Sequence, residues 1–508
     1  MNSRFFGLVA KLVILALANA MLVFAAYVAF LAGQTWIGVG LTTIVLVVNV
    51  VYFNKRFVAG KFLLPGVILL ALFVVGPILY TIFMSGFNYK TGNEISKDEA
   101  LVQLLDTGLV QDSSGKAFDM TPGVYKGKPA ALLTDQTDRN VYLGFDGTLI
   151  PVDPSTTKLS KYGVALAIPG FAAWSSAQVA NNESTILSFR FQQGSGKYVA
   201  AQSGDTAALV FQSFALSKDK KTLYDKVNNV HYKDNGNGNF VSTADGSFLY
   251  PGWKEFNPGQ NYLGLITDPK ISGPFARVFV WTVVFAFVTV LVMFFAGLVL
   301  ALALEKKLKF RGLYRAILIL PYAMPSFMSI LIWNGMFNRQ FGAINELIGS
   351  PVDWYNDPIL AKVVLLVVNL WLGFPYFYMI STGALQALPS DIQEAAQIDG
   401  ATGSQIFRLI KLPLLLQILS PLLIASFAFN FNNFNLVYLL TAGGPTDVLN
   451  GETAGATDIL ITYAYKTAFG SNEQNLGLAS AISVVMFVIV GALSMWSLRQ
   501  SKVLEDMK

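Results

Sequence analysis

Two sets of uncharged residues with identical spacing form a candidate ligand-binding pattern. Each set follows the intervals i, i+3, i+4 and i+7, so each makes one stripe along a helix. The stripes are Asn369, Leu372, Gly373 and Tyr376, and Ser426, Phe429, Asn430 and Asn433. Amide and hydroxyl groups beside an aromatic ring suit a sugar, whose hydroxyls take hydrogen bonds while its C–H face stacks on the ring. Neither stripe contains a charged residue, which argues against an ionic substrate.

The same residues could instead hold helices together, because Asn and Gly commonly do so inside membranes. Two matched stripes favour the sugar site over this alternative. Gly373 allows the close approach of another group, and Pro375 is expected to open the backbone of this segment. Asn432 and Asn435 lie off the second stripe, and we interpret them as contacts to another subunit.

A different pattern lies between the two stripes. Glu394-Ala395-Ala396 favours a helix, Asp399-Gly400 favours a turn, and an apolar rhythm then resumes until Pro413 interrupts it. The sequence predicts a short helix, a turn and a second helix at the membrane surface. On local pattern alone, an ordinary amphipathic connector fits equally well.

The composition is that of a membrane protein with a soluble part. The chain has 508 residues, of which 54% are hydrophobic and 13% charged, against about 25% charged in globular proteins. The absence of Cys excludes disulfides and thiol chemistry, and the single His231 excludes a multi-histidine metal site within one chain. The formal charge of +5 reflects basic loops and does not indicate a nucleic-acid partner. Gly194-Ser195-Gly196-Lys197 lacks the full phosphate-loop pattern and is interpreted as a turn, so we expect no ATP hydrolysis, no catalytic residue and no cofactor in this chain.

Eight apolar runs are each close to the length of about 20 residues that a bilayer crossing requires. They are residues 12–32, 36–53, 62–84, 278–304, 316–333, 363–385, 414–440 and 476–498. Pro321 and Pro325 are expected to break the fifth run. The predicted fold class is an α-helical polytopic membrane protein with eight transmembrane helices.

Residues 85–274 have a different composition and no long apolar run. Short segments such as Thr185–Phe191 and Tyr198–Ala201 are typical of strands, and turn signals such as Asp146-Gly147 separate them. We expect a mostly β domain inserted between helices three and four. The predicted domains are residues 1–84 with three transmembrane helices, the soluble domain 85–274, and a core of five helices, 275–508, with a loop at 386–413.

Charge gives the orientation, because short loops rich in Lys and Arg stay in the cytoplasm. Such clusters occur at the N-terminus, after runs two, four and six, and at the C-terminus: Arg4 and Lys11; Lys55, Arg56 and Lys61; Lys306, Lys307, Lys309, Arg311 and Arg315; Arg408 and Lys411; Arg499, Lys502 and Lys508. We therefore expect both termini and the loop 386–413 in the cytoplasm, and residues 85–274 in the periplasm.

The chain resembles the permease subunits of binding-protein-dependent sugar importers. The spacing from Glu394 through Gly400 to Leu412-Pro413 is similar to the coupling loop of ABC-importer permeases. Four further runs resemble the permease family of maltose/maltodextrin ABC importers: residues 281–285, 318–327, 369–376 and 426–434. The resemblance covers nearly the whole chain and is strongest from Pro274 onward.

The resemblance implies a function and a set of partners. The chain would be a bacterial inner-membrane permease subunit of an ATP-driven maltose/maltodextrin importer, and not an enzyme. It would form the translocation path with a homologous second permease subunit, dock on an ATPase homodimer that binds ATP and Mg²⁺, and receive sugar from a periplasmic maltose-binding protein. The eight stripe residues would contact the sugar, and Glu394, Ala395, Ala396 and Gly400 would contact the ATPase.

Alternatives remain open at this point. The permease could carry another neutral oligosaccharide. An ion-driven secondary transporter would need intramembrane carboxylates or histidines, and none lies at the centre of spans four to eight. A membrane-anchored receptor acting through residues 85–274 would need neither stripe nor loop.

Overall fold

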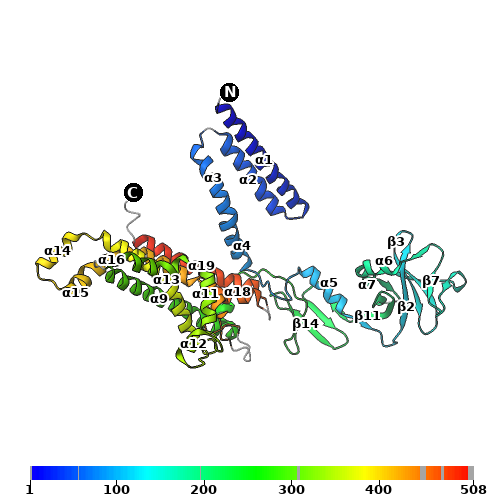
Figure 1. The fold of residues 1–508 in the computed structure, drawn as a ribbon. Helices are drawn as coiled ribbons and strands as arrows, with labels where there is room; N and C mark the ends of the chain where they lie inside the picture. Colours follow the sequence, from blue (N-terminus) through cyan, green and yellow to red (C-terminus); the bar gives the residue numbers. More distant parts are fainter. Residues whose placement is uncertain are drawn as a thin grey trace.

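The computed structural model describes residues 3–54, 56–194, 196–305, 309–446, 453–470 and 474–500. Several basic residues used to predict the orientation lie outside these ranges: Lys55, Lys306, Lys307, Lys502 and Lys508. The molecule is elongated, with a bundle of apolar helices at one end and a β-rich domain at the other (Figure 1). Helices α1, α2 and α3 project from the bundle, which they join through α4 beside α19.

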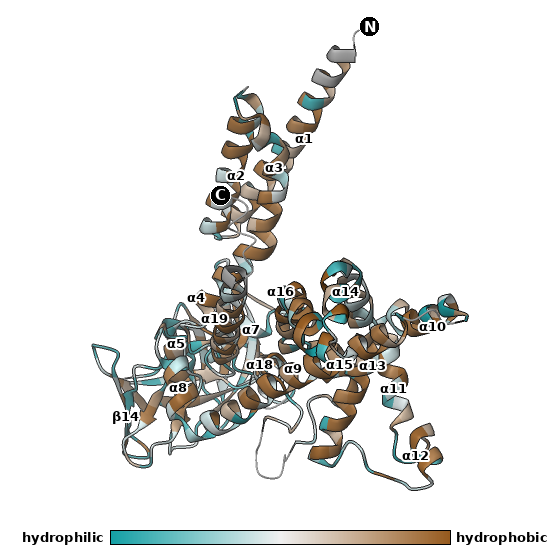
Figure 2. Cartoon of the chain, turned by 90° about the vertical axis from the view of Figure 1, so that its left-hand side faces the viewer, coloured by the Kyte–Doolittle hydropathy of each residue, from teal (hydrophilic) through white to brown (hydrophobic). Residues whose placement is uncertain are grey.

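Within the described ranges, seven helices are long and apolar enough to cross a membrane, or eight if one bent pair is a single span. Figure 2 shows the apolar colouring that follows these helices. The seven are Val9–Leu31 within α1 (Ser3–Leu31), α2 (Thr35–Phe53), Val58–Met84 from α3 (Val58–Leu70) to α4 (Gly76–Met84), α9 (Pro269–Ala303), α13 (Pro358–Ala387), Gly403–Phe431 ending in α16 (Leu412–Phe431), and Leu476–Trp496 within α19 (Leu476–Gln500). A π-helical turn at Ala71–Val75 precedes Pro77, where proline removes a backbone donor.

The predicted fifth run forms the bent pair. α10 (Arg311–Ala323) and α11 (Ser326–Met336) meet at an angle of 91°. Met324 is extended because the following Pro325 disfavours helical geometry in the residue before it. The predicted break in this run is therefore present.

The predicted seventh run is also interrupted. α16 ends at Phe431, and α17 (Phe434–Thr441) begins after Asn433, whose Oδ1 accepts a hydrogen bond from Leu436 N at 3.4 Å. Asn is a favoured helix N-cap because its side chain satisfies a free backbone donor. By contrast, α13 continues through Pro375, so the predicted opening there is wrong. Pro375 is buried among neighbouring helices, which can compensate for a missing hydrogen bond.

Small residues bring α9 and α13 into direct contact. A Cβ on Gly297 of α9 would lie 2.5 Å from the backbone nitrogen of Tyr378, and a Cβ on Gly373 of α13 would lie 2.3 Å from Met293 Sδ. Helices in lipid associate through such close packing, since lipid is as apolar as the side chains. This contact fixes the rotation of α13 against α9.

The insert is mostly β, as predicted. Its strands are β1 (Leu109–Gln111), β2 (Ala117–Tyr125), β3 (Lys128–Asp135), β4 (Val141–Phe145), β5 (Thr148–Pro151), β6 (Lys158–Leu159), β7 (Ala165–Ala167), β8 (Phe171–Ala173), β9 (Arg190–Gln192), β10 (Lys197–Ala201), β11 (Thr206–Gln212), β12 (Phe214–Leu216), β13 (Thr222–Asp225), β14 (Val230–Asp234), β15 (Phe240–Ser242) and β16 (Phe248–Leu249). Its helices are α5 (Lys97–Thr107), α6 (Ser176–Asn181) and α7 (Glu183–Leu187), and α8 (Gln260–Thr267) leads into α9. The expected strand Thr185–Phe191 is wrong over its first half, where Ile186 faces the core from α7. Tyr198–Ala201 lies in β10 as expected.

In the described part of the insert, nine strands form one sheet in the order β1-β11-β10-β9-β5-β4-β3-β2-β8. β11 also pairs with β2, so the sheet closes on itself. Closure encloses an apolar core that includes Phe118, Leu133 and Val199, and leaves the short strands β1 and β8 at the margins of the sheet. β12 to β16 form a second antiparallel sheet. Asp146-Gly147, with positive φ at both residues, turns β4 into β5 as predicted.

The two ends of the insert are tied together at its base. The Asn93 side-chain amide donates to Gly238 O at 2.7 Å and to Trp253 O at 3.1 Å. Asn93 and Trp253 are fully buried. This joins the segment that follows α4 to the segment that precedes α8, so the insert is a closed unit on the chain.

The acid stability of the insert is expected to depend on Asp112. Hydrogen bonds from Lys197 and Ser114 lower the pKa of Asp112 to about 2, and Lys197 Nζ lies 2.6 Å from its carboxylate. An unfolded Asp has a pKa of about 3.9. The ion therefore stabilises the insert fully above about pH 4, and this contribution is lost as the pH falls from about 4 to 2.

Asp112→Asn should consequently lower the midpoint of thermal unfolding of the β domain at pH 7, with the difference from wild type shrinking toward pH 2. Circular dichroism of the full-length protein measures it. Asp146→Asn, which removes an exposed carboxylate 3.3 Å from Lys128, is the control and should change little. An equal difference at pH 7 and pH 2 would contradict the assignment.

Candidate functional site

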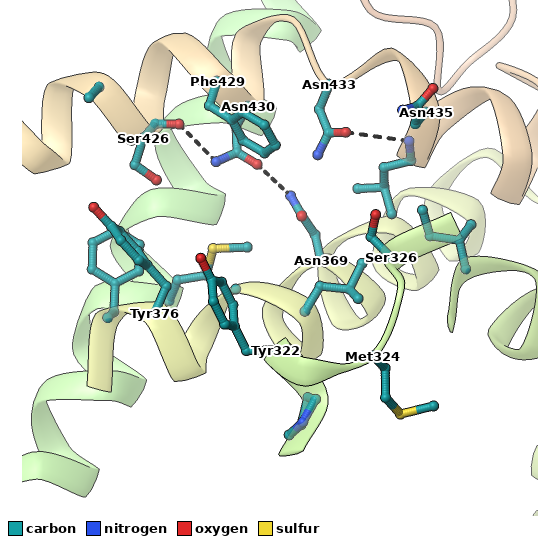
Figure 3. Close-up of a pocket in the computed structure, with 18 residues that line it drawn as sticks. Tyr322, Met324, Ser326, Asn369, Tyr376, Ser426, Phe429, Asn430, Asn433 and Asn435 are labelled. Atoms are coloured by element: carbon teal, nitrogen blue, oxygen red, sulfur yellow. Dashed lines mark hydrogen bonds between the residues drawn. The ribbon is translucent and has the colours of Figure 1, made fainter. Parts of the chain in front are cut away.

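A cavity of about 550 Å³ opens among the apolar helices, and all eight stripe residues line it (Figure 3). The first stripe lies on α13, and the second lies on α16 and continues to Asn433 in the break that follows it. The remaining walls come from α9, α10, α11 and α17. The other lining residues are Met293, Pro321, Tyr322, Met324, Ser326, Ile330, Phe377, Ala425, Asn435 and Leu436. Among the residues that the structure describes, no lining side chain carries a charge.

An amide pair joins the two stripes. Asn369 Nδ2 donates to Asn430 Oδ1 at 2.8 Å, and Asn430 Nδ2 donates to Ser426 O at 2.9 Å. Both asparagines are buried. The pair therefore holds α13 against α16, which is the helix-joining role considered above. The two side-chain amides keep further hydrogen-bonding capacity. No donor within the described residues reaches Asn369 Oδ1, and each amide nitrogen has a second hydrogen.

Aromatic rings and hydroxyls complete the wall around this pair. Phe429 is 68% exposed although it lies beside the buried Asn430. Figure 3 shows the phenol oxygens of Tyr322 and Tyr376 directed into the cavity from the opposite side. A flat ring next to amides and hydroxyls can hold an uncharged polyhydroxyl molecule by stacking and by hydrogen bonds.

The helical spacing of residues in the sequence did not identify every residue of this wall. Tyr322 and Ser326 reach the cavity from either side of the α10–α11 bend. The prolines that cause the bend were a usable signal, because broken helices often surround transporter binding sites. Asn435 also lines the cavity, although it lies off the second stripe; its interpretation as a contact to another subunit stays a prediction. A new helix begins after Asn433. The helical period counted along α16 therefore does not predict which residues of α17 face the cavity.

Asn432 and Gly373 have local packing roles. Asn432 Nδ2 donates to Ala428 O at 3.3 Å within the same turn of chain, which gives the side chain a partner inside this subunit. Gly373 does allow a close approach, but the group that approaches is Met293 of α9. Gly373 therefore affects the cavity indirectly, because it sets how closely α13 packs on α9.

The segment between the stripes folds as a helix, a turn and a second helix. α14 (Ser390–Ile398) ends before Gly400, whose φ of +82° favours glycine. α15 (Gly403–Ile406) follows, with Thr402 and Gln405 forming a capping box, and a π-helical turn at Phe407–Lys411 leads into α16. In Figure 1 this loop lies at the end of the bundle opposite the insert.

The loop carries several exposed side chains on its surface. Glu394 is exposed and forms no ion pair with any residue in the described ranges. Ile392, Ile398 and Leu409 are exposed large apolar residues on the same short segment, with Ile398 86% exposed. An unpaired carboxylate among exposed apolar side chains is typical of a protein-binding surface.

Comparison with known proteins agrees with the architecture. Residues 293–501 match the family described as binding-protein-dependent transport system inner membrane component. The chain is 36% identical over 472 residues to the maltose/maltodextrin transport system permease protein MalF of Vibrio vulnificus strain YJ016, covering 90% of this chain and 88% of the relative. The chain belongs to the MalF permease family. The MalF protein of Photorhabdus laumondii is 37% identical over 470 residues, covering 90% of this chain and 89% of the relative.

Family membership establishes the general role. A MalF-type chain is a permease subunit of an ABC sugar importer, a membrane component and not an enzyme. Among solved structures, a bacterial ABC transporter involved in the import of the acidic polysaccharide alginate matches 48% of this chain and 82% of its own, at 18% identity and a TM-score of 0.41.

Proposed function

We propose that this chain is the membrane permease of an ATP-driven maltose/maltodextrin importer and that the α13–α16 cavity is its sugar site. The observation that carries the proposal is the meeting of the two stripes around one uncharged cavity. Its volume of about 550 Å³ lies within the range of about 300–1,000 Å³ common for small-molecule sites. The names of the MalF relatives supply the substrate class.

The same proposal includes a topology. With the bent α10–α11 pair counted as one span, the chain crosses the membrane eight times, with residues 85–274 in the periplasm between crossings three and four. Both termini and the loop 386–413 are cytoplasmic. The placement of the insert and the loop at opposite ends of the bundle supports this arrangement (Figure 1).

The partners follow from that topology. The α14–α15 loop docks on an ATPase homodimer, which binds ATP and Mg²⁺. A homologous permease subunit forms the other half of the path, and a periplasmic maltose-binding protein delivers sugar on the insert side. The uncovered apolar residues of the loop support the first of these contacts.

The sugar site is tested by Asn430→Ala and Phe429→Ala. Asn430→Ala removes the acceptor of Asn369 and one amide of the wall, and Phe429→Ala removes an exposed ring. A hydrogen bond and an aromatic stacking contact each contribute about 0.5–1.5 kcal/mol, so each variant should weaken the apparent sugar affinity by about 2- to 12-fold, and the double variant by more. Uptake of labelled maltose into vesicles that contain the assembled importer measures the effect.

Phe287→Ala is the matched control, because Phe287 is a 56% exposed ring on α9 that does not line the cavity. Its uptake should equal that of wild type. Unchanged uptake in the Phe429→Ala, Asn430→Ala double variant would show that the stripe only joins helices. Uptake driven by a proton gradient without ATP would contradict the importer class.

A further inference from the structure

The wall of the cavity depends on α17, a helix of 8 residues that is separated from α16 by the break at Asn432-Asn433. Asn433, Asn435 and Leu436 at its beginning line the cavity. A short helix with a break behind it has little intrinsic stability. Its inner face is buried against α9, α11 and α13 through Leu436, Val437 and Leu440. Polar contacts at its far end fix its position further.

Those contacts are organised by a buried ion pair. Asp458 Oδ2 lies 2.7 Å from Lys466 Nζ of α18 (Leu460–Phe469) and accepts from Gly455 N at 2.7 Å. Asp458 Oδ1 accepts from Thr462 Oγ1 at 2.8 Å. The Asp458 side chain is fully buried and that of Lys466 is 23% exposed. The carboxylate thus has a charged partner and further donors, as a buried ion requires.

The loop that carries Asp458 is joined to the end of α17. Thr457 Oγ1 lies 2.8 Å from Thr441 Oγ1, the last residue of α17, and Thr457 N donates to Gly443 O at 3.2 Å. A Cβ on Gly443 would lie 1.8 Å from Asp458 Oδ1, so this glycine fits directly against the carboxylate. We call this group the Asp458 clamp: Thr441, Gly443, Thr457, Asp458, Thr462 and Lys466.

The clamp is fixed in turn to α9. Leu460 N donates to Thr282 Oγ1 at 2.9 Å, and Trp281 Nε1 donates to Thr457 O at 3.3 Å. Tyr465 of α18 also packs on the rings of Phe434 and Tyr438 of α17, at 5.1 and 5.4 Å between centroids. Hydrogen bonds and ring contacts therefore connect α9 to α17 through the clamp.

We propose that Asp458 and Lys466 are positioning residues that set the distance of the α17 wall from α9 and α13, and thereby the affinity of the cavity for its sugar. The statement about sugar affinity rests on the proposed function. Without Lys466, a buried carboxylate is left unpaired, which is strongly destabilising locally. The carboxylate must then take up a proton, admit water or leave its position, and each change weakens the contacts that tie the loop to α17.

The first measurement needs no sugar. Lys466→Met should speed amide hydrogen exchange in the α17 peptide of the full-length protein in lipid nanodiscs, while exchange in α13 stays unchanged. Lys466→Arg keeps the charge and should restore the slow exchange. Asp458→Asn with Lys466→Met removes both charges and should recover most of the protection, because no buried ion remains unpaired. This double variant also provides a test if Lys466→Met does not fold.

The second measurement is maltose uptake by the assembled importer. Lys466→Met should raise the half-saturating maltose concentration by about tenfold or more with a smaller change in maximal rate, and Lys466→Arg should reverse this. Arg339→Met is the control, since it breaks an exposed ion pair of 2.9 Å with Asp353 that lies outside the clamp.

Unchanged α17 exchange in Lys466→Met would overturn the inference, as would a loss of maximal rate with unchanged half-saturation. A wild-type importer that carries no maltose would refute the proposed function alone, and the exchange result would still decide whether the clamp positions α17.

Discussion

Glu394→Lys is expected to abolish sugar-stimulated ATP hydrolysis while the importer complex still assembles. Glu394 is exposed on α14 without an ion-pair partner in the described part of the chain. In the proposed complex its carboxylate meets a cation on the ATPase, and reversal of its charge places like charges together. Disruption of one charged contact at an interface costs about 2–5 kcal/mol, or about 30-fold and more in the coupled step.

The measurement is ATPase activity of the purified complex with and without sugar-loaded binding protein. Glu346→Lys, the same charge reversal on the exposed face of α12 (Ala343–Ile348), is the control and should keep full stimulation. Assembly is checked by co-purification of the subunits. Full stimulation in Glu394→Lys would remove the loop from the coupling mechanism.

Gly297→Ala is expected to destabilise the bundle and distort the cavity. The added Cβ would meet backbone atoms, Tyr378 N at 2.5 Å and Phe377 C at 2.6 Å. Backbone of a packed helix cannot rotate away as a side chain can, so α9 and α13 must separate. Overpacking of this kind costs about 1–3 kcal/mol, and separation would also shift Asn369 from Asn430.

Two further glycines give a graded comparison. At Gly373 the added Cβ meets the side chain of Met293, which is flexible, so Gly373→Ala should be milder. At Gly383 nothing lies within 4 Å, so Gly383→Ala should be neutral or slightly stabilising. Thermal unfolding of the solubilised protein and maltose uptake should rank the variants in the order 297, 373, 383 from most to least damaging. Equal effects at Gly297 and Gly383 would contradict the close packing of α9 on α13.

Sequence patterns located the stripes because all their residues except Asn433 lie on two continuous helices, α13 and α16. Between Asn369 and Tyr376, and between Ser426 and Asn430, the helical period holds, so residues at these intervals share a face. The pattern failed at Asn435, beyond a break that resets the phase. It also gave no hint of Tyr322 and Ser326, which reach the cavity through a 91° bend.

The insert shows the same limit. Tyr198–Ala201 is a strand between two partners, β9 and β11, whereas Thr185–Leu187 has similar residue types but lies in α7 and contributes Ile186 to the core. Short apolar segments have weak local preferences, so their form is decided by the neighbours available in the fold.

The sequence by itself determined where the apolar helices lie along the chain and that the stripe residues are uncharged. Those properties are local, since the transfer of each segment from water to lipid depends on its own residues. Only the tertiary structure decided that the two stripes face each other across one cavity, with α17 as an added wall. The rotation of one helix against another is set by contacts between residues far apart in sequence, namely Gly297 on Phe377 and Tyr378, Asn369 on Asn430, and Asp458 on Lys466.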